Sequence, residues 1–294
     1  ANGAVAYGPT DDVESVLALR KAYEMGVTFY DTSDLYGYGH SEELVGETFM
    51  AVRHKIIIAS KVGFLNFDGA QDFSPRHIRT AIEGSLKRLQ TDYIDLYLLH
   101  SPPIDLFENN QTILSTLESL KQAGKIRAIG ISVRSPDDGL HAINRLGFGV
   151  IEVNLNLVDQ RALENGLMDT CKEKGIGVVI RTPLCYGFLT GSYTAADLFD
   201  KQDQRSKWSK PQIERWANAY RTFIEYLSDT EKSTNAQFAL RFCLSCPGVS
   251  TVIPGMLTRE QVEENMTSSQ IGVLSQADWK SVLTTYQHNV FFEK

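Results

Sequence analysis

The sequence lacks two features that would place the protein in a membrane or on nucleic acid. No apolar run approaches the length of a helix that spans a bilayer. The formal net charge is −7, so there is no excess of positive charge to bind nucleic acid or an anionic membrane. Hydrophobic residues make up 43% of the chain, which is enough for a substantial core. We therefore expect a globular protein with neither kind of partner.

Cysteine is also scarce, and its spacing is not typical of a metal or redox site. Cys171 and Cys185 stand alone, and Cys243 and Cys246 form a lone CxxC pair without a second pair of ligands. Because this pair follows an amphipathic helical stretch, we interpret it as packing at a helix end. The composition points to a reducing compartment, and we expect a cytoplasmic protein with no metal site.

Apolar, strand-like segments alternate with amphipathic helical segments along the chain. Each expected strand is followed by helical periodicity. Ser41 and Ser74 are expected to cap two of these helices, and a single helix is expected over Gln160–Lys174. Strands that read as continuous apolar runs and alternate with helices are typical of a parallel sheet covered on both faces. The seven expected strands are Val27–Tyr30, Lys55–Ser60, Tyr93–Leu99, Ile126–Ile131, Val150–Leu155, Ile176–Ile180 and Val249–Ile253.

A missing glycine fingerprint separates the two architectures that this alternation allows. A doubly wound sheet usually carries G-x-G-x-x-G between a strand and a helix, and Gly37-Tyr38-Gly39 lacks the third glycine. A (β/α)8 TIM barrel has about this length but needs eight strands. We predict this α/β barrel, with its first strand upstream of residue 1 or missing. Residues 1–294 then form one domain, with a long cofactor or substrate loop at 182–211 and a C-terminal helix and tail at 275–294.

Polar side chains lie where the predicted strands end. Asp31, Lys61 and His100 follow the first three strands, and Tyr36 lies in the loop after Asp31. Taken singly, each has an ordinary structural interpretation: a turn cap, a solvated charge or a core histidine. In a barrel, however, the carboxyl ends of all strands meet at one mouth. An acid, an ammonium, an imidazole and a phenol gathered there predict a catalytic site.

Five stretches of the sequence resemble the aldo-keto reductases, in the same order and over nearly the whole chain. They are FYDTSDLYG, IIIASKVG, YIDLYLLHSP, IRAIGIS and RTPLCYGFLTG, the last followed by IPG and EEN. The resemblance implies an oxidoreductase that transfers a hydride between a nicotinamide cofactor and an aldehyde, ketone or sugar-like carbonyl. A cofactor-binding regulatory subunit with little turnover is the alternative. The filled catalytic positions favour the enzyme, and the strand ends lack the paired carboxylates or metal ligands of a hydrolytic barrel.

The resemblance also implies a catalytic tetrad of Asp31, Tyr36, Lys61 and His100. Tyr36 would protonate the developing alkoxide, although a phenol with a pKa of about 10 is a weak acid. A nearby Lys61 ammonium is expected to lower that pKa, and Asp31 to keep the ammonium charged. His100 would donate a hydrogen bond to the substrate carbonyl. Asp34 is the alternative acid, against its interpretation as a solvated loop residue.

By the same resemblance, two clusters of residues hold the cofactor, and three positions depart from the family pattern. Val133 replaces an asparagine, and Glu152 stands in place of a glutamine, so that its carboxylate accepts from the carboxamide NH2 but cannot donate to its carbonyl. Arg181 replaces a stacking aromatic, a role that a planar guanidinium can also fill. The implied contacts are Ser132, Glu152, Arg181, Pro183, Leu184, Gly187, Leu189 and Gly191 at the nicotinamide and diphosphate, and Gly255, Met256, Gln261, Glu264 and Asn265 at the adenosine.

The cofactor is expected to be NADP(H), with NAD(H) as the alternative. The positions at which the family holds the 2′-phosphate are Gly255, Met256 and Gln261 here. Arg259 is the cation left in this stretch, and it either pairs with the phosphate or lies on the first turn of a surface helix. The loop at 182–211, with Asp203, Arg205 and Trp208, is either a cover over the cofactor and substrate or an ordinary surface loop. Four aromatic residues are candidates for the substrate pocket or for plain packing, namely Tyr38, Phe64, Phe67 and Trp216. The oligomeric state stays open.

Overall fold

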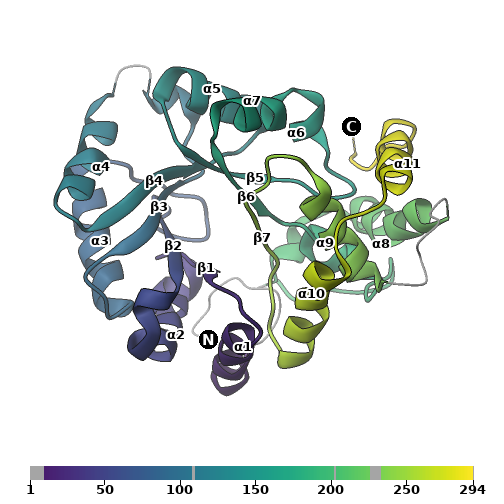
Figure 1. Cartoon of the computed structure of the whole chain (residues 1–294), viewed down its shortest axis with the longest axis horizontal. Coiled ribbons are helices and arrows are strands. Elements are labelled where there is room, and N and C mark those ends of the chain that lie inside the picture. Colours follow the sequence, from purple (N-terminus) through teal and green to yellow (C-terminus); the bar gives the residue numbers. More distant parts are fainter. Residues whose placement is uncertain (1–9, 108–109, 202, 226–232, 294) are drawn as a thin grey trace.

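The strands of the protein form one parallel sheet that the helices surround (Figure 1). This computed structural model describes residues 10–107, 110–201, 203–225 and 233–293. The strands run parallel and in sequence order, each hydrogen-bonded to the next. They are β1 (Phe29–Asp31), β2 (Ile57–Val62), β3 (Ile94–His100), β4 (Ile126–Ser132), β5 (Val150–Asn154), β6 (Gly177–Arg181) and β7 (Thr251–Ile253).

This strand order confirms the barrel and excludes a doubly wound sheet, in which the order reverses at a switch point. The two ends of the sheet, β1 and β7, lie near each other, so the sheet curls into a nearly closed barrel. The strands appear where the sequence predicts them, with ends that differ by a few residues. Residues 1–9, for which the sequence shows no strand pattern, lie outside the described residues.

Several helices begin at side-chain caps, of which Ser74 is the one that the sequence predicts. Ser74 and Ser135 each accept a backbone N–H of the following turn, and a proline occupies the first helical position after each. Thr234 and Gln237 form a reciprocal capping box. The helices are α1 (Asp12–Glu24), α2 (His40–Phe49), α3 (Pro75–Arg88), α4 (Thr112–Gln122), α5 (Pro136–Leu146), α6 (Arg161–Glu164), α7 (Leu167–Lys174), α8 (Lys210–Ile224), α9 (Asn235–Ser245), α10 (Arg259–Ile271) and α11 (Gln276–Gln287).

Two expectations about helices are wrong. The single helix expected over Gln160–Lys174 is two helices, because Gly166 adopts a left-handed φ of 80° and the Asn165 side chain caps α7 through the Leu167 N–H. Ser41 does not cap α2, which starts one residue earlier, after Gly39. The Ser41 hydroxyl instead accepts a hydrogen bond from Thr32 at 2.8 Å, which ties α2 to the loop after β1.

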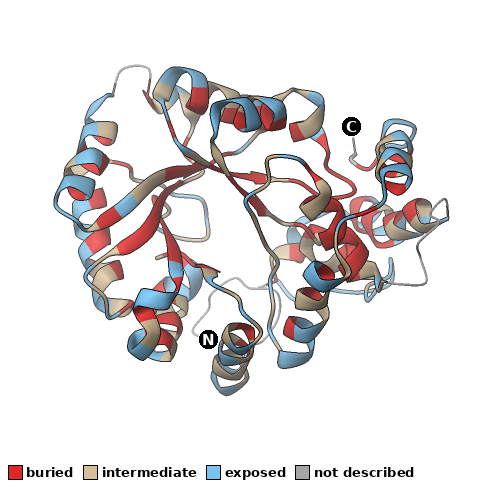
Figure 2. Cartoon of the chain, viewed as in Figure 1, coloured by how far each residue is buried: buried red, intermediate tan, exposed pale blue. Residues whose placement is uncertain are grey.

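Two apolar layers make up the core. The larger one fills the space between the sheet and the helices, and Figure 2 shows it as buried residues along the strands and the facing sides of the helices. Burying each leucine or isoleucine of this layer stabilises the fold by about 1.5–3 kcal/mol. The smaller layer lies inside the barrel and is formed by Ala59, Leu96, Leu98 and Val179. It is the floor beneath the polar residues at the strand ends.

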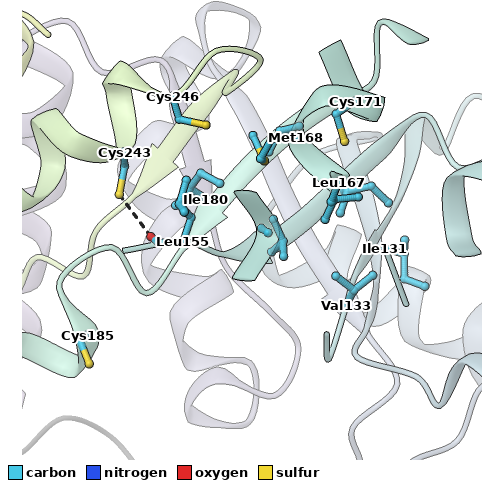
Figure 3. Packing of buried hydrophobic residues seen from close by; sticks show 14 of the residues in the cluster. Ile131, Val133, Leu155, Leu167, Met168, Cys171, Ile180, Cys185, Cys243 and Cys246 are labelled. Atoms are coloured by element: carbon cyan, nitrogen blue, oxygen red, sulfur yellow. Dashed lines mark hydrogen bonds between the residues drawn. The ribbon is translucent and has the colours of Figure 1, made fainter. Parts of the chain in front are cut away.

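The four cysteines belong to the packing, as expected. All are buried and unpaired, and Figure 3 shows three of them between the sheet and the helices that cover it. The Cys243 thiol donates to the carbonyl oxygen of Leu155 at 3.2 Å. Burial raises the pKa of the Cys246 thiol to about 12, so it stays protonated and unreactive near neutral pH. None of the described helices is long and apolar enough to cross a membrane.

Candidate active site

The predicted catalytic side chains share the inner face of the barrel. Successive side chains of a strand point to opposite faces, so residues two apart lie on the same one. Asp31, Lys61 and His100 therefore continue the inner rows of β1, β2 and β3, the last two above Ala59 and Leu98 of the inner layer. Ser132, Glu152 and Arg181 extend the rows of β4, β5 and β6 in the same way. The strands thus gather all six at the carboxyl end of the barrel.

Lys61 is the centre of this cluster and is fully buried. Its ammonium forms an ion pair with Asp31 and donates to the Thr32 carbonyl oxygen at 3.2 Å. The Tyr36 hydroxyl lies 3.4 Å from the same nitrogen. Tyr36 is 37% exposed as a residue, so it lies between the buried Lys61 ammonium and the solvent at the mouth of the barrel. The geometry is that of a phenol with a charged neighbour.

Glu152 is a second carboxylate on the same lysine. It is 2% exposed, and its Oε2 lies 3.6 Å from the Lys61 ammonium. Its Oε1 accepts from the Ser132 hydroxyl at 3.0 Å and stands 4.0 Å from the Nε of Arg181. Arg181 also donates to the carbonyl oxygen of Val133 at 3.0 Å. Two carboxylates, Asp31 and Glu152, therefore lie beside two cationic side chains, Lys61 and Arg181, and their charges nearly cancel.

This balance of charge sets the protonation of the cluster. Burial opposes the charge on Lys61, but the carboxylates of Asp31 and Glu152 outweigh it and raise the pKa of Lys61, which stays protonated. Burial raises the pKa of Asp31 to about 7; Lys61 opposes that shift and Glu152 adds to it. Desolvation likewise raises the pKa of Tyr36; Lys61 opposes that rise, and Asp31 and Glu152 add to it. Lys61 thus acts on the pKa of Tyr36 in the expected direction, but the desolvation of the phenol outweighs it.

His100 lies beside Tyr36 and is neutral. The two rings are 5.8 Å apart and nearly perpendicular, and the Phe64 ring packs edge-on against His100 at 4.8 Å. Burial lowers the pKa of His100 well below its ordinary value, and Lys61 and Arg181 lower it further. Its Nδ1 lies 3.2 Å from the Ser33 hydroxyl. A neutral imidazole of this kind can donate one hydrogen bond to a substrate oxygen.

The nicotinamide end of the expected cofactor site contains unpartnered polar atoms. Within the described residues, Asp31 Oδ1, Glu152 Oε2 and Arg181 Nε are buried and have no hydrogen-bond partner. A carboxamide has two N–H donors and one carbonyl acceptor, which suit one acceptor and one donor of this set. The residues present therefore fit a nicotinamide, with Glu152 as the acceptor and Arg181 as the donor. No group of metal-binding side chains occurs within the described residues.

The loop after β6, expected to wrap the diphosphate, is a tight turn. Cys185, Tyr186 and Gly187 take left-handed φ values of 46°, 58° and 90° in succession. Left-handed non-glycine residues carry strain and gather at functional sites. The N–H groups of Gly187 and Leu189 both donate to the Leu184 carbonyl oxygen, and that of Gly191 donates to Phe188. These N–H groups already have partners within the loop, and their expected use in binding a diphosphate stays a prediction.

The adenosine end is more exposed. Gly255 is exposed, and the side chain of Gln261 in α10 accepts the N–H of Leu257, which precedes that helix, at 2.7 Å. Asn265 is buried, and Glu264 is half-buried. Arg259, the expected phosphate cation, pairs with Glu14 of α1 at 3.2 Å and keeps its side chain 49% exposed. The structure places these residues on and before α10 but leaves the cofactor contacts untested.

Parts of the segment 182–211 are packed, although most of its described residues after Gly191 are exposed. Arg205 forms a buried two-pronged pair with Asp203, at 2.9 and 2.6 Å. Its guanidinium lies 4.5 Å from the ring centroids of Tyr193 and Phe199. Trp208 packs against the buried Trp216, which belongs to the core and not to an open pocket. Of the other pocket aromatics expected, Tyr38 and Phe67 pack on each other and Phe64 contacts His100.

Three further residues of the mouth were not predicted from the sequence. Ser33 contacts His100, and its place inside the D-T-S-D stretch was the available signal. Gln71 donates to the His100 carbonyl oxygen at 3.0 Å and accepts from Arg134 at 2.6 Å. Gln71 and Arg134 lie in loops with no motif around them, so only the folded chain shows that they brace the histidine.

Comparisons with family models, with curated proteins and with solved structures agree with one another. The model of the aldo/keto reductase family matches residues 1–286. The oxidoreductase YqkF of Bacillus subtilis is 32% identical over 96% of this chain and 90% of its own length. The aldo-keto reductase yakc [NADP(+)] of Schizosaccharomyces pombe is 32% identical over 94% and 83%. The solved glycerol dehydrogenase of Gluconobacter oxydans superposes with a TM-score of 0.79 and 29% identity, over 99% of this chain and 90% of that one.

Proposed function

The chain belongs to the aldo-keto reductase family, and from this premise we propose that Asp31, Tyr36, Lys61 and His100 are its catalytic tetrad. The protein is an NAD(P)-dependent oxidoreductase that acts on a small carbonyl or alcohol. The observation that carries the assignment is the Lys61 ammonium, which pairs with Asp31 and lies 3.4 Å from the Tyr36 hydroxyl. Glu152 and Arg181 would hold the nicotinamide, which supplies the hydride when it is bound.

The proposed residues divide the proton chemistry of reduction among them. Tyr36 gives its proton to the carbonyl oxygen, and the Lys61 ammonium then stabilises the phenolate that remains. Asp31 keeps that ammonium charged and in place. His100, being neutral, donates a hydrogen bond to the same substrate oxygen and withdraws charge from the carbonyl. In alcohol oxidation the roles reverse, and Tyr36 as the phenolate accepts the proton of the alcohol.

We propose NADP(H) as the preferred cofactor and a cytoplasmic location. One relative at 32% identity is named for NADP(+), and Arg259 is the cation nearest the expected phosphate position in the sequence. The unpaired, buried thiols are compatible with a reducing compartment. We further propose that the chain acts as one barrel domain and that the 182–211 segment covers the cofactor as a fixed lid. The buried Asp203–Arg205 pair supports that role.

The assignment is tested by cofactor oxidation with a panel of aldehydes, ketones and sugars, using wild type and Tyr36→Phe. Loss of the proton donor should reduce kcat by about 10²–10⁴-fold. Binding of the cofactor, followed by its fluorescence, should be nearly unchanged. Tyr38→Phe is the matched control, since Tyr38 is exposed and packs on Phe67. Near-normal turnover by Tyr36→Phe would remove Tyr36 from this role.

A further inference from the structure

His100 can serve a carbonyl only if its single ring hydrogen is on the right nitrogen. Its imidazole is neutral, so one nitrogen donates and the other accepts. The nitrogen that faces the interior is Nδ1, which lies 3.2 Å from the Ser33 hydroxyl. If Nδ1 accepts from Ser33, the hydrogen is on Nε2 and is available to the substrate. If Nδ1 donates to Ser33, Nε2 has no hydrogen to give.

The hydroxyl of Ser33 is shared between His100 and a carboxyl group. Ser33 is fully buried, and its Oγ also lies 3.2 Å from Asp34 Oδ1. The Leu35 N–H donates to the same oxygen at 3.1 Å and fixes its position. A serine hydroxyl has one hydrogen to donate. His100 and Asp34 therefore compete for that hydrogen, and the charge on Asp34 decides the outcome.

We propose that Ser33 and Asp34 select the tautomer of His100, so that His100 carries its hydrogen on Nε2 when Asp34 is protonated and on Nδ1 when Asp34 is ionised. An ionised Asp34 draws the Ser33 hydrogen toward itself, and Ser33 then accepts from His100 Nδ1. A protonated Asp34 donates to Ser33, whose hydrogen turns to Nδ1. The change adds one proton, taken from solvent, to Asp34. Ser33 and Asp34 are thus positioning residues that act through His100.

The groups around Asp34 keep both of its states accessible. Glu42 of α2 is fully buried and is held by Ser60 at 2.5 Å and by Arg88 of α3 at 2.8 Å. Tyr97 of β3 lies beneath with its hydroxyl buried. Burial and the Glu42 carboxylate raise the pKa of Asp34 to about 7, whereas Ser33, Arg88 and the Leu35 N–H oppose that rise. On the side of His100, the neighbouring charges are Lys61 and Arg181.

The test reads the tautomer directly, without turnover. The full chain is labelled with ¹⁵N-histidine, and the His100 ring signals are identified by their loss in His100→Gln. Spectra are recorded on the acidic and alkaline sides of the pKa of about 7 that burial gives Asp34. We expect Nε2–H in acid and Nδ1–H in alkali for wild type. Asp34→Asn should keep Nε2–H at both, because its amide donates to Ser33 without titrating.

Two further variants test whether the pH response of the His100 tautomer passes through Ser33 or reflects a general change in the charge of the protein. Ser33→Ala cuts the link, so the His100 tautomer should stop responding to pH. Asp68→Asn, at an exposed aspartate of the nearby loop, should respond like wild type. If Ser33→Ala fails to fold, the comparison of wild type with Asp34→Asn decides alone. One tautomer at both pH values in wild type, or the wild-type response in Asp34→Asn, would overturn the proposal.

The consequence for catalysis rests on the proposed function and is measured separately. Loss of one donor to a developing oxyanion typically costs about 10²–10³-fold in kcat. We expect kcat for reduction to fall by up to about 10²-fold as Asp34 ionises, and the fall to disappear in Asp34→Asn. A tautomer that switches in an inactive protein would refute the enzyme but keep the switch. An active enzyme in which the His100 tautomer does not change with pH would support the proposed function and refute the switch.

Discussion

At the scale of the residue, the departure with the largest chemical effect is Glu152. A glutamine at this position could bind a carboxamide on both its sides, whereas the carboxylate can only accept. In exchange, Glu152 adds a second negative charge 3.6 Å from the Lys61 ammonium. This charge offsets the field with which Lys61 would favour the phenolate of Tyr36. It therefore keeps Tyr36 protonated to higher pH, which suits the donor in a reduction.

Glu152→Gln should move the alkaline limb of the pH profile of kcat/KM for reduction to lower pH. Glu152 raises the pKa of Tyr36, so a neutral amide lowers it, and the protonated phenol is lost earlier as the pH rises. The measurement is the pH profile of carbonyl reduction at saturating cofactor. Glu118→Gln, on the exposed face of α4, should leave the limb in place. An unmoved limb in Glu152→Gln would show that Glu152 does not reach the phenol.

At the scale of the element, α2 is held against the end of α3 by a glycine. A Cβ on Gly46 would lie 2.5 Å from the backbone oxygen of Arg88, which the helix geometry does not let move freely. The same contact brings Glu42 of α2 to Arg88, at 2.8 Å from its Nε. The loop that carries Ser33, Asp34 and Tyr36 leads directly into α2, so this packing also supports the site.

Gly46→Ala should lower the free energy of unfolding by about 1–3 kcal/mol, the usual cost of overpacking. Urea unfolding followed by circular dichroism measures this change. Gly149→Ala is the control, because a Cβ there meets open space and the backbone φ is ordinary; we expect a change within about 0.5 kcal/mol. Equal stability of the two variants would mean that α2 shifts away from α3 without cost.

The pair between α1 and α10 decides the cofactor preference that we propose. Arg259 is engaged by Glu14, so it must exchange this carboxylate for a phosphate when NADP(H) binds. Arg259→Ala should reduce the ratio of kcat/KM for NADPH over NADH, and Glu14→Gln, which releases Arg259, should increase it. An exposed ion pair is worth about 0–1 kcal/mol, so each shift should be at most about fivefold. A ratio that neither substitution changes would exclude Arg259 from the site.

At the scale of the whole molecule, the curled sheet brings residues that are distant in the sequence together in one site. Asp31, Lys61, His100, Glu152 and Arg181 come from five different strands. A ligand that bridges these strand ends binds the folded state and not the unfolded chain. Saturation of the proposed cofactor site should therefore stabilise the entire barrel.

Adding NADP⁺ at about a hundred times its Kd should increase the free energy of unfolding by about 2.7 kcal/mol. The increase is measured by urea unfolding with and without the cofactor. Adenosine at the same concentration is the control, since it does not reach the strand ends and should stabilise less. Equal stabilisation by both compounds would confine binding to the adenosine end.

Local pattern was enough to predict the elements and the family, because those signals lie within short stretches. Apolar runs located the seven strands, and DTSDLYG with the following strand ends supplied the residues of the proposed tetrad, which the fold brings together. The errors arose where a contact between two elements, or the backbone conformation of a single residue, overrides the periodic pattern. Ser41 bonds to Thr32 instead of capping α2, and the split of α6 from α7 depends on a left-handed Gly166.

The sequence by itself determined which chemical groups stand at the strand ends, because strand, loop and motif are all local. The tertiary structure alone decided how these groups act on one another. Burial raises the pKa of Tyr36 despite the opposing charge of Lys61, and the Ser33 hydroxyl faces both His100 and Asp34. Burial and distance set the strength of every charge, and both are properties of the closed fold and not of the order of residues.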